Sequence, residues 1–432
     1  MDASLGQVSL KAFSRPIQPN RFLRHQPALS LREESPTSSL SQQRSQVIRA
    51  VSDERQGAPA LTLFGAASRS DSDRIAEAFD SARLTQARVL AELTKSELAE
   101  KIGVSAAAVG QYESGITKPR PELVPHLSKA LSVPTSFFAT GRPFGRLDST
   151  NAHFRSLRST RAKDRAKATA HAEQLWELTH ALEKRVRFPD LDLPEIPIGT
   201  TPSEAARALR HAWAIDRGPV PHLAATMESR GIVVCLIPLT NEAVTRVKAY
   251  STSALGRPLV IVTPERFKSV YEYRFTCAHE IGHLLLHANP LPGDRQQERE
   301  ADQFAAEFLT PQAEITPLLP KTVRIAALDK LSRTWGVSIE SFIYRMGELQ
   351  LVSEASIRRA HQRLAGMSEL RREEPLTSYP GELPTLLGEA LDLAAHHGFD
   401  RADLASELCW TRTHLASVLG ENDSRPALRV VR

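Results

Sequence analysis

One short segment, CAHEIGHLLLH at residues 277–287, restricts this chain more than any other feature. Its His279 and His283 stand four positions apart in an otherwise apolar run. On a helix, positions four apart lie on one face, so both imidazoles can point a nitrogen at one metal ion. Glu280 lies about 100° further round, where it can reach a water on that ion without binding the ion. The spacing predicts a helix with a Zn²⁺ site in which Glu280 is the catalytic base.

A core helix that carries incidental histidines is the alternative interpretation of this segment. However, two unpaired imidazoles are costly to bury in an apolar helix. An acidic helix is also predicted over residues 295–309. Catalytic zinc sites of this kind need a third protein ligand, often a glutamate from the next helix. These two features favour the metal site.

The acidic helix offers three glutamates, which differ in the direction they face. Its apolar stripe consists of Ala301, Phe304, Ala305, Phe308 and Leu309. At about 100° per residue, Glu298 lies roughly 60° from the centre of that stripe, Glu300 roughly 100° and Glu307 roughly 120°. We therefore predict Glu298 as the third ligand, with Glu300 as the alternative.

Three further residues near these ligands have predicted roles. Asp302 shares the face of Glu298 and is expected to hold a ligand imidazole by a hydrogen bond. His287 is two turns from His279, too far to bind the same ion, so it either supports the site from behind or lies on the surface. Cys277 is expected in the core.

These segments resemble the ImmA/IrrE-type metallopeptidases, which combine H-E-x-x-H with a downstream E-x-E-A-[ND]-x-F-A-A run. YRFTCAHEIGHLLLH and EREADQFAAEFLTP carry the resemblance, and SEAARALRHAW, GIVVCLIPL and GRPLVIV extend it upstream, over about residues 200–312. The resemblance implies a zincin-like, zinc-dependent peptidase that cleaves a helix-turn-helix repressor. Lys248 stands where many relatives have an acidic residue, a departure that affects the substrate cleft rather than metal binding.

A second motif, TKSELAEKIGVSAAAVGQYESGITKPRP at residues 94–121, predicts a helix-turn-helix. Ala99 is small enough for two helices to cross, and Gly103 suits a turn that needs a positive φ. Ser105 caps the second helix, whose N-terminal end would enter the major groove. A generic helical hairpin is the alternative. The segment resembles an Xre/Cro-type repressor domain, which residues 78–140 would cover in full.

The expected partner of this domain is a double-stranded DNA operator, bound by a homodimer. Ala106 and Ala107 at the front of the second helix cannot form bidentate hydrogen bonds with bases, although their methyl groups can meet thymine methyls. We therefore expect modest direct readout. The candidate DNA contacts are Lys95, Ser105, Ala106 and Gln111, with Lys118 and Arg120 on phosphates.

The complete chain of 432 residues predicts several domains and a mainly α fold with a small β-sheet, in the α+β class. Strands are expected over 232–239, 247–252 and 258–263, and a long amphipathic helix over 161–186. The predicted units are a disordered tail (1–69), the DNA-binding five-helix domain (70–140), a linker and long helix (141–199), the zinc metallopeptidase domain (200–312), a helical subdomain (313–370) and a C-terminal helical region (371–432). No internal repeat is evident, although residues 400–420 have the apolar spacing of a helix-turn-helix without a glycine in the turn.

The composition indicates the kind of cellular compartment in which the protein works. Its three cysteines are far apart and odd in number, which argues against disulfides and for a reducing compartment. No apolar run reaches the ~18 residues of a membrane helix. The net charge is only +5, and much of the positive excess lies in the first 50 residues, which hold seven Lys/Arg against three Asp/Glu. A global charge this small does not by itself indicate a nucleic-acid partner. We expect a cytoplasmic bacterial protein.

Together the motifs predict a DNA-binding transcriptional regulator whose zinc-dependent metallopeptidase domain cleaves a repressor protein. Two alternatives stay open. The metallo-domain could be a sensor without turnover, or the protein could be one partner of a toxin–antitoxin or phage-immunity system. Intact His279, Glu280, His283 and Glu298 favour the peptidase over the sensor.

Overall fold

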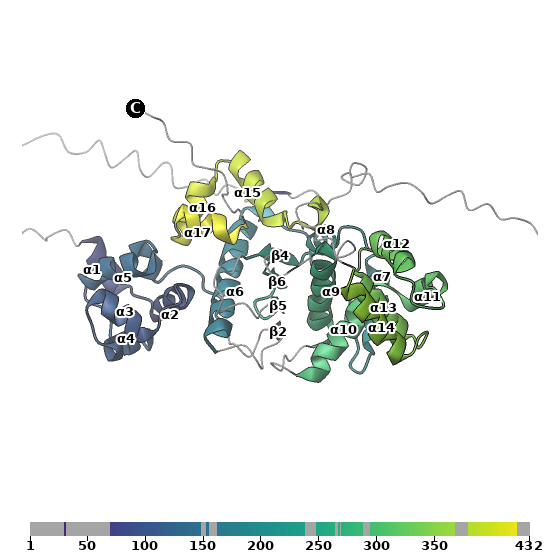
Figure 1. Cartoon of the computed structure of the whole chain (residues 1–432). Coiled ribbons are helices and arrows are strands. Elements are labelled where there is room, and N and C mark those ends of the chain that lie inside the picture. The colour runs from purple at the N-terminus through teal and green to yellow at the C-terminus, as the bar shows by residue number, and fades with distance from the viewer. Residues whose placement is uncertain are drawn as a thin grey trace, which may run out of the picture.

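The computed structural model describes residues 30–31, 70–147, 153–154, 162–237, 248–263, 267, 269–287, 294–367 and 379–420. The predicted disordered tail over 1–69 lies outside these residues, except for the short strand β1 (Ser30–Leu31). Most of the described chain is helical, with a small β-sheet in the middle of the molecule (Figure 1). The α+β prediction is confirmed.

Five helices form the predicted DNA-binding domain. They are α1 (Asp71–Glu77), α2 (Ser81–Leu90), α3 (Lys95–Ile102), α4 (Ala106–Glu113) and α5 (Leu123–Leu131), followed by the 3₁₀ helix η1 (Thr135–Phe138). Thr94 and Glu97 form a capping box at the start of α3. Gly103 ends that helix at φ 72°, and buried Ala99 lies where α3 and α4 meet. The helix-turn-helix therefore forms as its sequence predicts.

A four-stranded sheet forms the centre of the molecule. Its strands lie in the order β2 (His153–Phe154), β5 (Ala249–Thr252), β6 (Leu259–Val262) and β4 (Val233–Leu236). β5 runs antiparallel to β2 and β6, whereas β4 and β6 are parallel. The three predicted strands are confirmed with shorter bounds, and of the residues predicted at their ends, 238–239 and 247 lie outside the described chain. β3 (Val186–Arg187) pairs with β1.

Both faces of the sheet are covered, because alternate residues of each strand point to opposite sides. On one side lie α7 (Pro202–Ala212), α8 (Leu223–Ser229), α9 (Val270–Leu286) and α10 (Arg295–Leu309). Val234, Val260 and Val262 pack into this side with α9. Val233, Cys235, Leu259 and Ile261 pack into the opposite side with α6 (Ala162–Glu183). The predicted helices over about 267–287 and 295–309 are α9 and α10.

The long helix α6 joins the DNA-binding domain to the sheet. Its predicted amphipathic pattern suggests one solvated face, but many of its polar side chains are buried along with its apolar ones. Glu177 pairs with Arg83 of α2, and Glu173 accepts a hydrogen bond from Gln86 Nε2 at 3.1 Å. On the sheet side, Tyr250 Oη donates to the backbone oxygen of Ala168 at 2.8 Å. Polar side chains of α6 that the sequence pattern places in solvent therefore contact buried polar partners on other elements.

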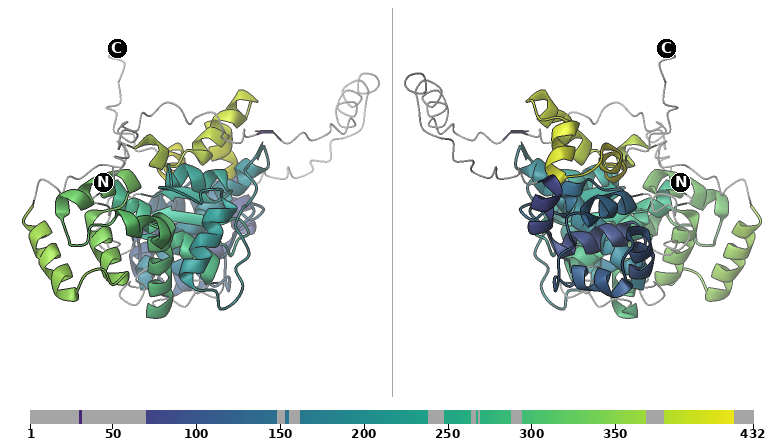
Figure 2. Two further views of the ribbon diagram at one scale, coloured as in Figure 1. Left: turned by 90° about the vertical axis from the view of Figure 1, so that its right-hand side faces the viewer. Right: turned by 90° about the vertical axis from the view of Figure 1, so that its left-hand side faces the viewer.

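The remaining helices form two attached units. The helical subdomain comprises α11 (Gln312–Ile315), η4 (Thr316–Leu318), α12 (Ile325–Trp335), α13 (Ile339–Glu348) and α14 (Glu354–Ala365), and it protrudes from the body (Figure 2). The C-terminal region comprises η7 (Pro380–Glu382), α15 (Leu386–His396), α16 (Arg401–Leu408) and α17 (Arg412–Val418). Arg274 of α9 ties both units together, since it pairs with Glu382 and donates to the backbone oxygen of Gly336 at 2.9 Å.

The turn of the helix-turn-helix recurs twice in the described chain, which the sequence did not reveal as a repeat. In all three hairpins a residue with positive φ ends the first helix and a hydroxyl side chain caps the second. The hairpin over 400–420 has this geometry with Cys409 at φ 53° in place of glycine. The corresponding residues are Ala99, Gly103 and Ser105 in the first hairpin, Ser332, Gly336 and Ser338 in the second, and Ala405, Cys409 and Thr411 in the third.

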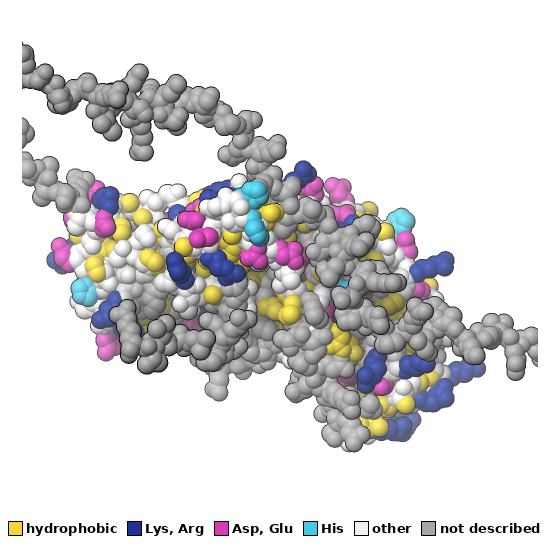
Figure 3. All heavy atoms as spheres, turned by 90° about the horizontal axis from the view of Figure 1, so that it is seen from above, with side chains coloured by type: hydrophobic (Ala, Val, Ile, Leu, Met, Phe, Trp, Pro, Cys, Tyr) yellow, Lys and Arg dark blue, Asp and Glu magenta, His cyan; other side chains and the backbone are white. Residues whose placement is uncertain are grey.

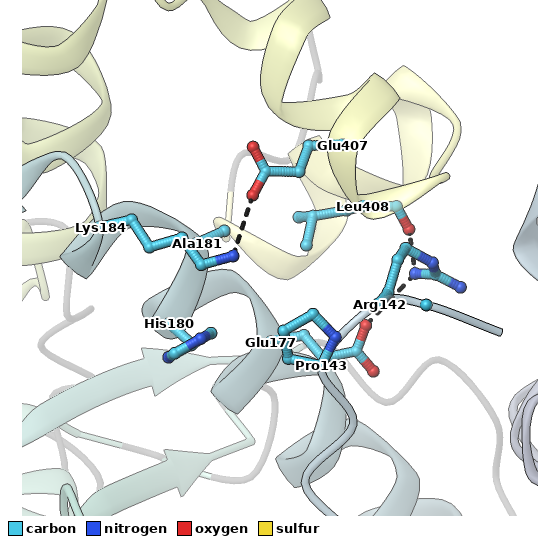
Figure 4. Close-up of a pocket in the computed structure, with 9 residues that line it drawn as sticks. Arg142, Pro143, Glu177, His180, Ala181, Lys184, Glu407 and Leu408 are labelled. Carbon is cyan, nitrogen blue, oxygen red and sulfur yellow. Dashed lines mark hydrogen bonds and ion pairs between the residues drawn. The ribbon is translucent and has the colours of Figure 1, made fainter. Parts of the chain in front are cut away.

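Arg142 lies where the DNA-binding domain, α6 and the C-terminal hairpin meet (Figure 4). Its guanidinium donates to the backbone oxygens of Phe137, at 2.7 Å, and Leu408, and lies 3.4 Å from Glu177 Oε2. A small cavity of about 160 Å³ opens beside it, and an ion pair between Lys184 and Glu407 lines that cavity. One partly buried arginine therefore contacts all three units.

α9 and α10 approach each other closely at Gly282. A Cβ atom on Gly282 would lie 3.0 Å from Phe304 Cδ1 and 3.2 Å from Ala301 Cα. The second-to-last position of the H-E-x-x-H motif therefore has to be small. This contact sets how far the acidic side chains of α10 stand from the histidines of α9.

Gly282→Val is predicted to force the two helices apart and to lower the free energy of unfolding by about 1–3 kcal/mol, the usual cost of overpacking. The matched control is Gly388→Val in α15, where an added Cβ would meet no atom within 4 Å. Urea unfolding followed by tryptophan fluorescence measures both variants. Equal midpoints for the two variants would contradict the close approach.

Candidate metal centre and nucleic-acid interface

His279 and His283 project from one face of α9 into the interior between α9 and α10. Both are buried, with 0% and 3% of their surface exposed. Their Nε2 atoms lie 3.0 Å apart. Two nitrogens bound to one tetrahedral zinc ion at about 2.0–2.1 Å would lie ~3.4 Å apart, so the spacing suits one shared ion.

Glu298 of α10 brings a carboxylate to the same point. Its Oε2 lies 3.7 Å from His279 Nε2, and its Oε1 lies 3.7 Å from His283 Nε2. One donor atom from each of the three residues falls within 4.8 Å of the other two. Two imidazoles and one carboxylate form the donor set of a catalytic zinc site with an open fourth position. These residues fit the predicted ion, although their roles as ligands remain a prediction.

The other acidic residues of α10 lie elsewhere. Asp302 Oδ1 is 2.8 Å from His279 Nδ1, on the side of the ring that faces away from Glu298. Glu300, the alternative ligand, lies 3.0 Å from His287 Nε2 instead. Glu307 is buried and pairs with Arg345 and Arg207. Among these carboxylates, Glu298 is the one that the structure places beside both histidines.

His287 and Cys277 are both buried. The surface position considered for His287 is wrong, because the ring packs behind His283 and its Nδ1 lies 2.9 Å from His283 Nδ1. Cys277 is fully buried, as expected for the core, and burial raises the pKa of its thiol. A thiol in this state is a packing group rather than a nucleophile.

Glu280 is fully buried beside the two histidines. Ser251 of β5 donates a hydrogen bond from Oγ to Glu280 Oε2 at 2.7 Å. Sequence reasoning did not identify Ser251. The available signal was the alternation of β5, which turns Ser251 and Ala249 towards α9 and Tyr250 towards α6. A buried hydroxyl thus holds one oxygen of the predicted base.

Lys248, the departure from the family pattern, lies at the start of β5. Its Nζ is 2.5 Å from Glu272 Oε1 in the first turn of α9. Both side chains are partly exposed. The lysine therefore pairs with the first turn of the helix that carries the candidate metal ligands.

The candidate DNA contacts lie on and around α4. Ser105 caps α4, where its Oγ accepts a hydrogen bond from Ala108 N at 3.1 Å. Ala106, Ala107 and Gln111 are exposed on this helix. Arg120 is exposed beyond it. The front of the second helix is thus open to solvent, as a major-groove contact requires.

Both candidate lysines also have partners inside the domain. Glu113 of α4 accepts two hydrogen bonds from Arg88, at 2.5 and 3.1 Å, and lies 3.3 Å from Lys95 Nζ. This buried carboxylate joins α2, α3 and α4. Lys118 Nζ donates to the backbone oxygen of Glu77. Either lysine would have to share or exchange its partner to reach a phosphate.

The DNA-binding domain is not basic overall. Residues 70–140 contain eight Lys/Arg and nine Asp/Glu. Cationic side chains gather instead on the protruding helical subdomain, at the lower right of Figure 3. The exposed ones there are Lys321, Arg324, Lys330, Arg333, Arg358, Arg359 and Arg363. Affinity for DNA through α4 must therefore depend on a few well-placed cations rather than on a general positive field.

Two family models match the chain at these two sites. Residues 84–138 match the Helix-turn-helix model, and residues 227–346 match the IrrE N-terminal-like domain of the M78 peptidases. The protein joins a helix-turn-helix domain to an ImmA/IrrE-type domain. The second match runs from α8 to α13, so it includes the strands β4, β5 and β6, both helices of the candidate metal centre and part of the helical subdomain. No curated protein matches the chain.

Each of the described helices is too short or too polar to cross a bilayer.

Metal analysis tests the ligand roles. The purified protein is predicted to hold about one zinc ion per chain, as a three-ligand site would. His283→Ala and Glu298→Gln should lose the ion, because each removes a donor. Glu280→Gln should retain it, because that residue is not a ligand. Loss of zinc from Glu280→Gln as complete as that from His283→Ala would show that the roles are misassigned.

Proposed function

We propose that this protein is a cytoplasmic DNA-binding transcriptional regulator whose metallopeptidase domain cleaves a repressor-type protein. The observation that carries the proposal is the full burial of Glu280, which follows His279 in the sequence, on the helix that brings two histidines to the carboxylate of Glu298. A domain that held zinc only as a sensor would need His279, His283 and Glu298 but no base. The match to an M78 peptidase model supports the same reaction class.

The residues of this chain can be given roles in peptide hydrolysis. Bound at the three donors, zinc would polarise the scissile carbonyl and acidify the attacking water. Glu280 takes the proton from that water and delivers it to the departing amine nitrogen. Ser251 holds one oxygen of Glu280 at 2.7 Å, which orients the carboxylate for both transfers. Asp302 orients the ring of His279 from the other side.

The helix-turn-helix domain would bind operator DNA. The exposed front of α4 would enter the major groove, with Gln111 contacting a base edge and Arg120 a phosphate. Alanines at the front of the helix limit direct readout, so a homodimer on two half-sites would supply the missing specificity. The match to a helix-turn-helix model supports this part.

Substitutions of the full chain test the DNA interface. Gln111→Ala is predicted to reduce the preference for the operator over unrelated DNA by about 1–3 kcal/mol. Arg120→Ala should weaken binding to all sequences and lower the slope of log K against log salt by ~1. Lys330→Ala removes a charge on α12, a helix at the opposite end of the molecule from α4 (Figure 1), and is the control. If Arg120→Ala and Lys330→Ala behave alike in fluorescence anisotropy titrations, α4 and its flank do not contact DNA.

Glu280→Gln separates the peptidase from a sensor. Proton transfer by a positioned base contributes about 10²–10⁴-fold in rate, so this variant should cleave candidate repressors at least a hundredfold more slowly. Zinc content and operator occupancy should stay at wild-type levels. Glu272→Gln, on the same helix but paired with Lys248, is the control and should cleave normally.

The same two variants can be compared in cells. Under the proposal, Glu280→Gln fails to induce the regulated genes while it still occupies their promoters. Normal induction by Glu280→Gln at normal protein levels would end the enzymatic interpretation and leave a sensor without turnover.

A further inference from the structure

His283 can bind a metal ion through Nε2 only if its proton is on Nδ1. A neutral imidazole carries one proton, and the nitrogen without it is the metal-binding one. In the structure His283 Nε2 faces His279 and Glu298, while Nδ1 lies 2.9 Å from Nδ1 of His287. Nδ1 of His283 must therefore donate a hydrogen bond to His287.

This donor fixes the state of the next ring. Because His287 Nδ1 accepts, its single proton sits on Nε2. That Nε2 lies 3.0 Å from Glu300 Oε2, which as a carboxylate oxygen only accepts. Every hydrogen bond in the sequence His283, His287, Glu300 then runs in one direction. The same result follows from the other end: Glu300 as a carboxylate only accepts, so a neutral His287 carries its proton on Nε2, accepts at Nδ1, and leaves His283 in the tautomer that binds metal.

The surroundings hold this chain in place. His287 is buried, with 6% of its surface exposed, and the Glu300 side chain is 30% exposed. Gln296 Nε2 donates to the other carboxylate oxygen of Glu300 at 2.6 Å, one turn earlier on α10. Glu300 is thus oriented towards His287 by its own helix.

The two candidate ligand histidines are supported differently. Asp302 contacts His279 directly at 2.8 Å, whereas the carboxylate of Glu300 reaches His283 only through the imidazole of His287. We propose that His287 and Glu300 are positioning residues that set the tautomer and ring orientation of His283 for metal binding. This inference rests on the proposed zinc site and adds two residues to it.

Zinc affinity of the full chain, measured by competition with a chromophoric chelator, tests the proposal. His287→Phe fills the space of the ring without nitrogens, and should weaken zinc by about 10–100-fold, the usual effect of losing such a support. His287→Gln can still accept from His283 and should recover part of the loss. Gln303→Ala, at an exposed position of α10, is the control and should bind as the wild type does.

Glu300 variants distinguish positioning from direct ligation. Glu300→Gln keeps an oxygen that accepts from His287, so it should bind zinc almost as tightly as the wild type, whereas Glu300→Ala should weaken it. If Glu300→Gln loses zinc as Glu298→Gln does, Glu300 is a ligand and the proposal fails. Zinc-free melting temperatures of all variants show whether any loss reflects folding.

A direct measurement of tautomers keeps the proposal testable even if a variant fails to fold. Long-range ¹H–¹⁵N spectra of the zinc-free wild type should show His283 protonated at Nδ1 and His287 at Nε2. The reverse assignment would overturn the proposal. Zinc binding by the wild type with unchanged affinity in His287→Phe and Glu300→Ala would overturn this inference alone. Absence of zinc binding by the wild type would overturn the proposed function and this inference with it.

Discussion

The close packing of α9 on α10 is the contact on which the candidate site depends. Gly282 lets the backbone of α10 approach within 3.2 Å of where a Cβ would stand. At that distance, Glu298 reaches His279 and His283, and Asp302 and Glu300 reach the outer nitrogens of the histidine chain. Each helix alone has only part of a donor set. A change of a few ångströms between them would leave two buried imidazoles without their carboxylates, a costly arrangement in a low-dielectric interior.

The strand β5 and the helix α6 connect this site to the DNA-binding domain. Adjacent residues of β5 point to opposite faces of the sheet, so Ser251 contacts Glu280 while Tyr250 contacts Ala168 of α6. The other side of α6 carries Glu177, which pairs with Arg83 of α2 and lies near Arg142. Buried ion pairs of this kind add little net stability compared with apolar packing. They do penalise any other docking geometry, because a buried charge that loses its partner costs several kcal/mol.

Local patterns could be predicted from the sequence because their causes are local. The capping box of Thr94 and Glu97, the left-handed turn at Gly103 and the facing of Glu298 all follow from residue type and helical spacing. Ser251 and His287 could not be assigned in the same way. Ser251 comes from a strand about thirty positions before Glu280, and the burial of His287 depends on α10 covering it. For the hairpin over 400–420 the apolar spacing was evident but the turn was not, because Cys409 takes the positive φ that glycine usually supplies.

By itself, the sequence determined the two motifs and the residues within each that face one side. Helical periodicity and cap chemistry act over a few residues, so they need no tertiary context. Helical facing favoured Glu298 over Glu300, whereas only the tertiary structure decided that Glu300 lies behind the histidines, against His287. It also decided that α6 is buried on both sides, because the polar face of α6 meets Arg83, Gln86 and Arg142 from other elements. The physical reason is that burial and ion pairing depend on distances between segments far apart in the chain, which no local pattern encodes.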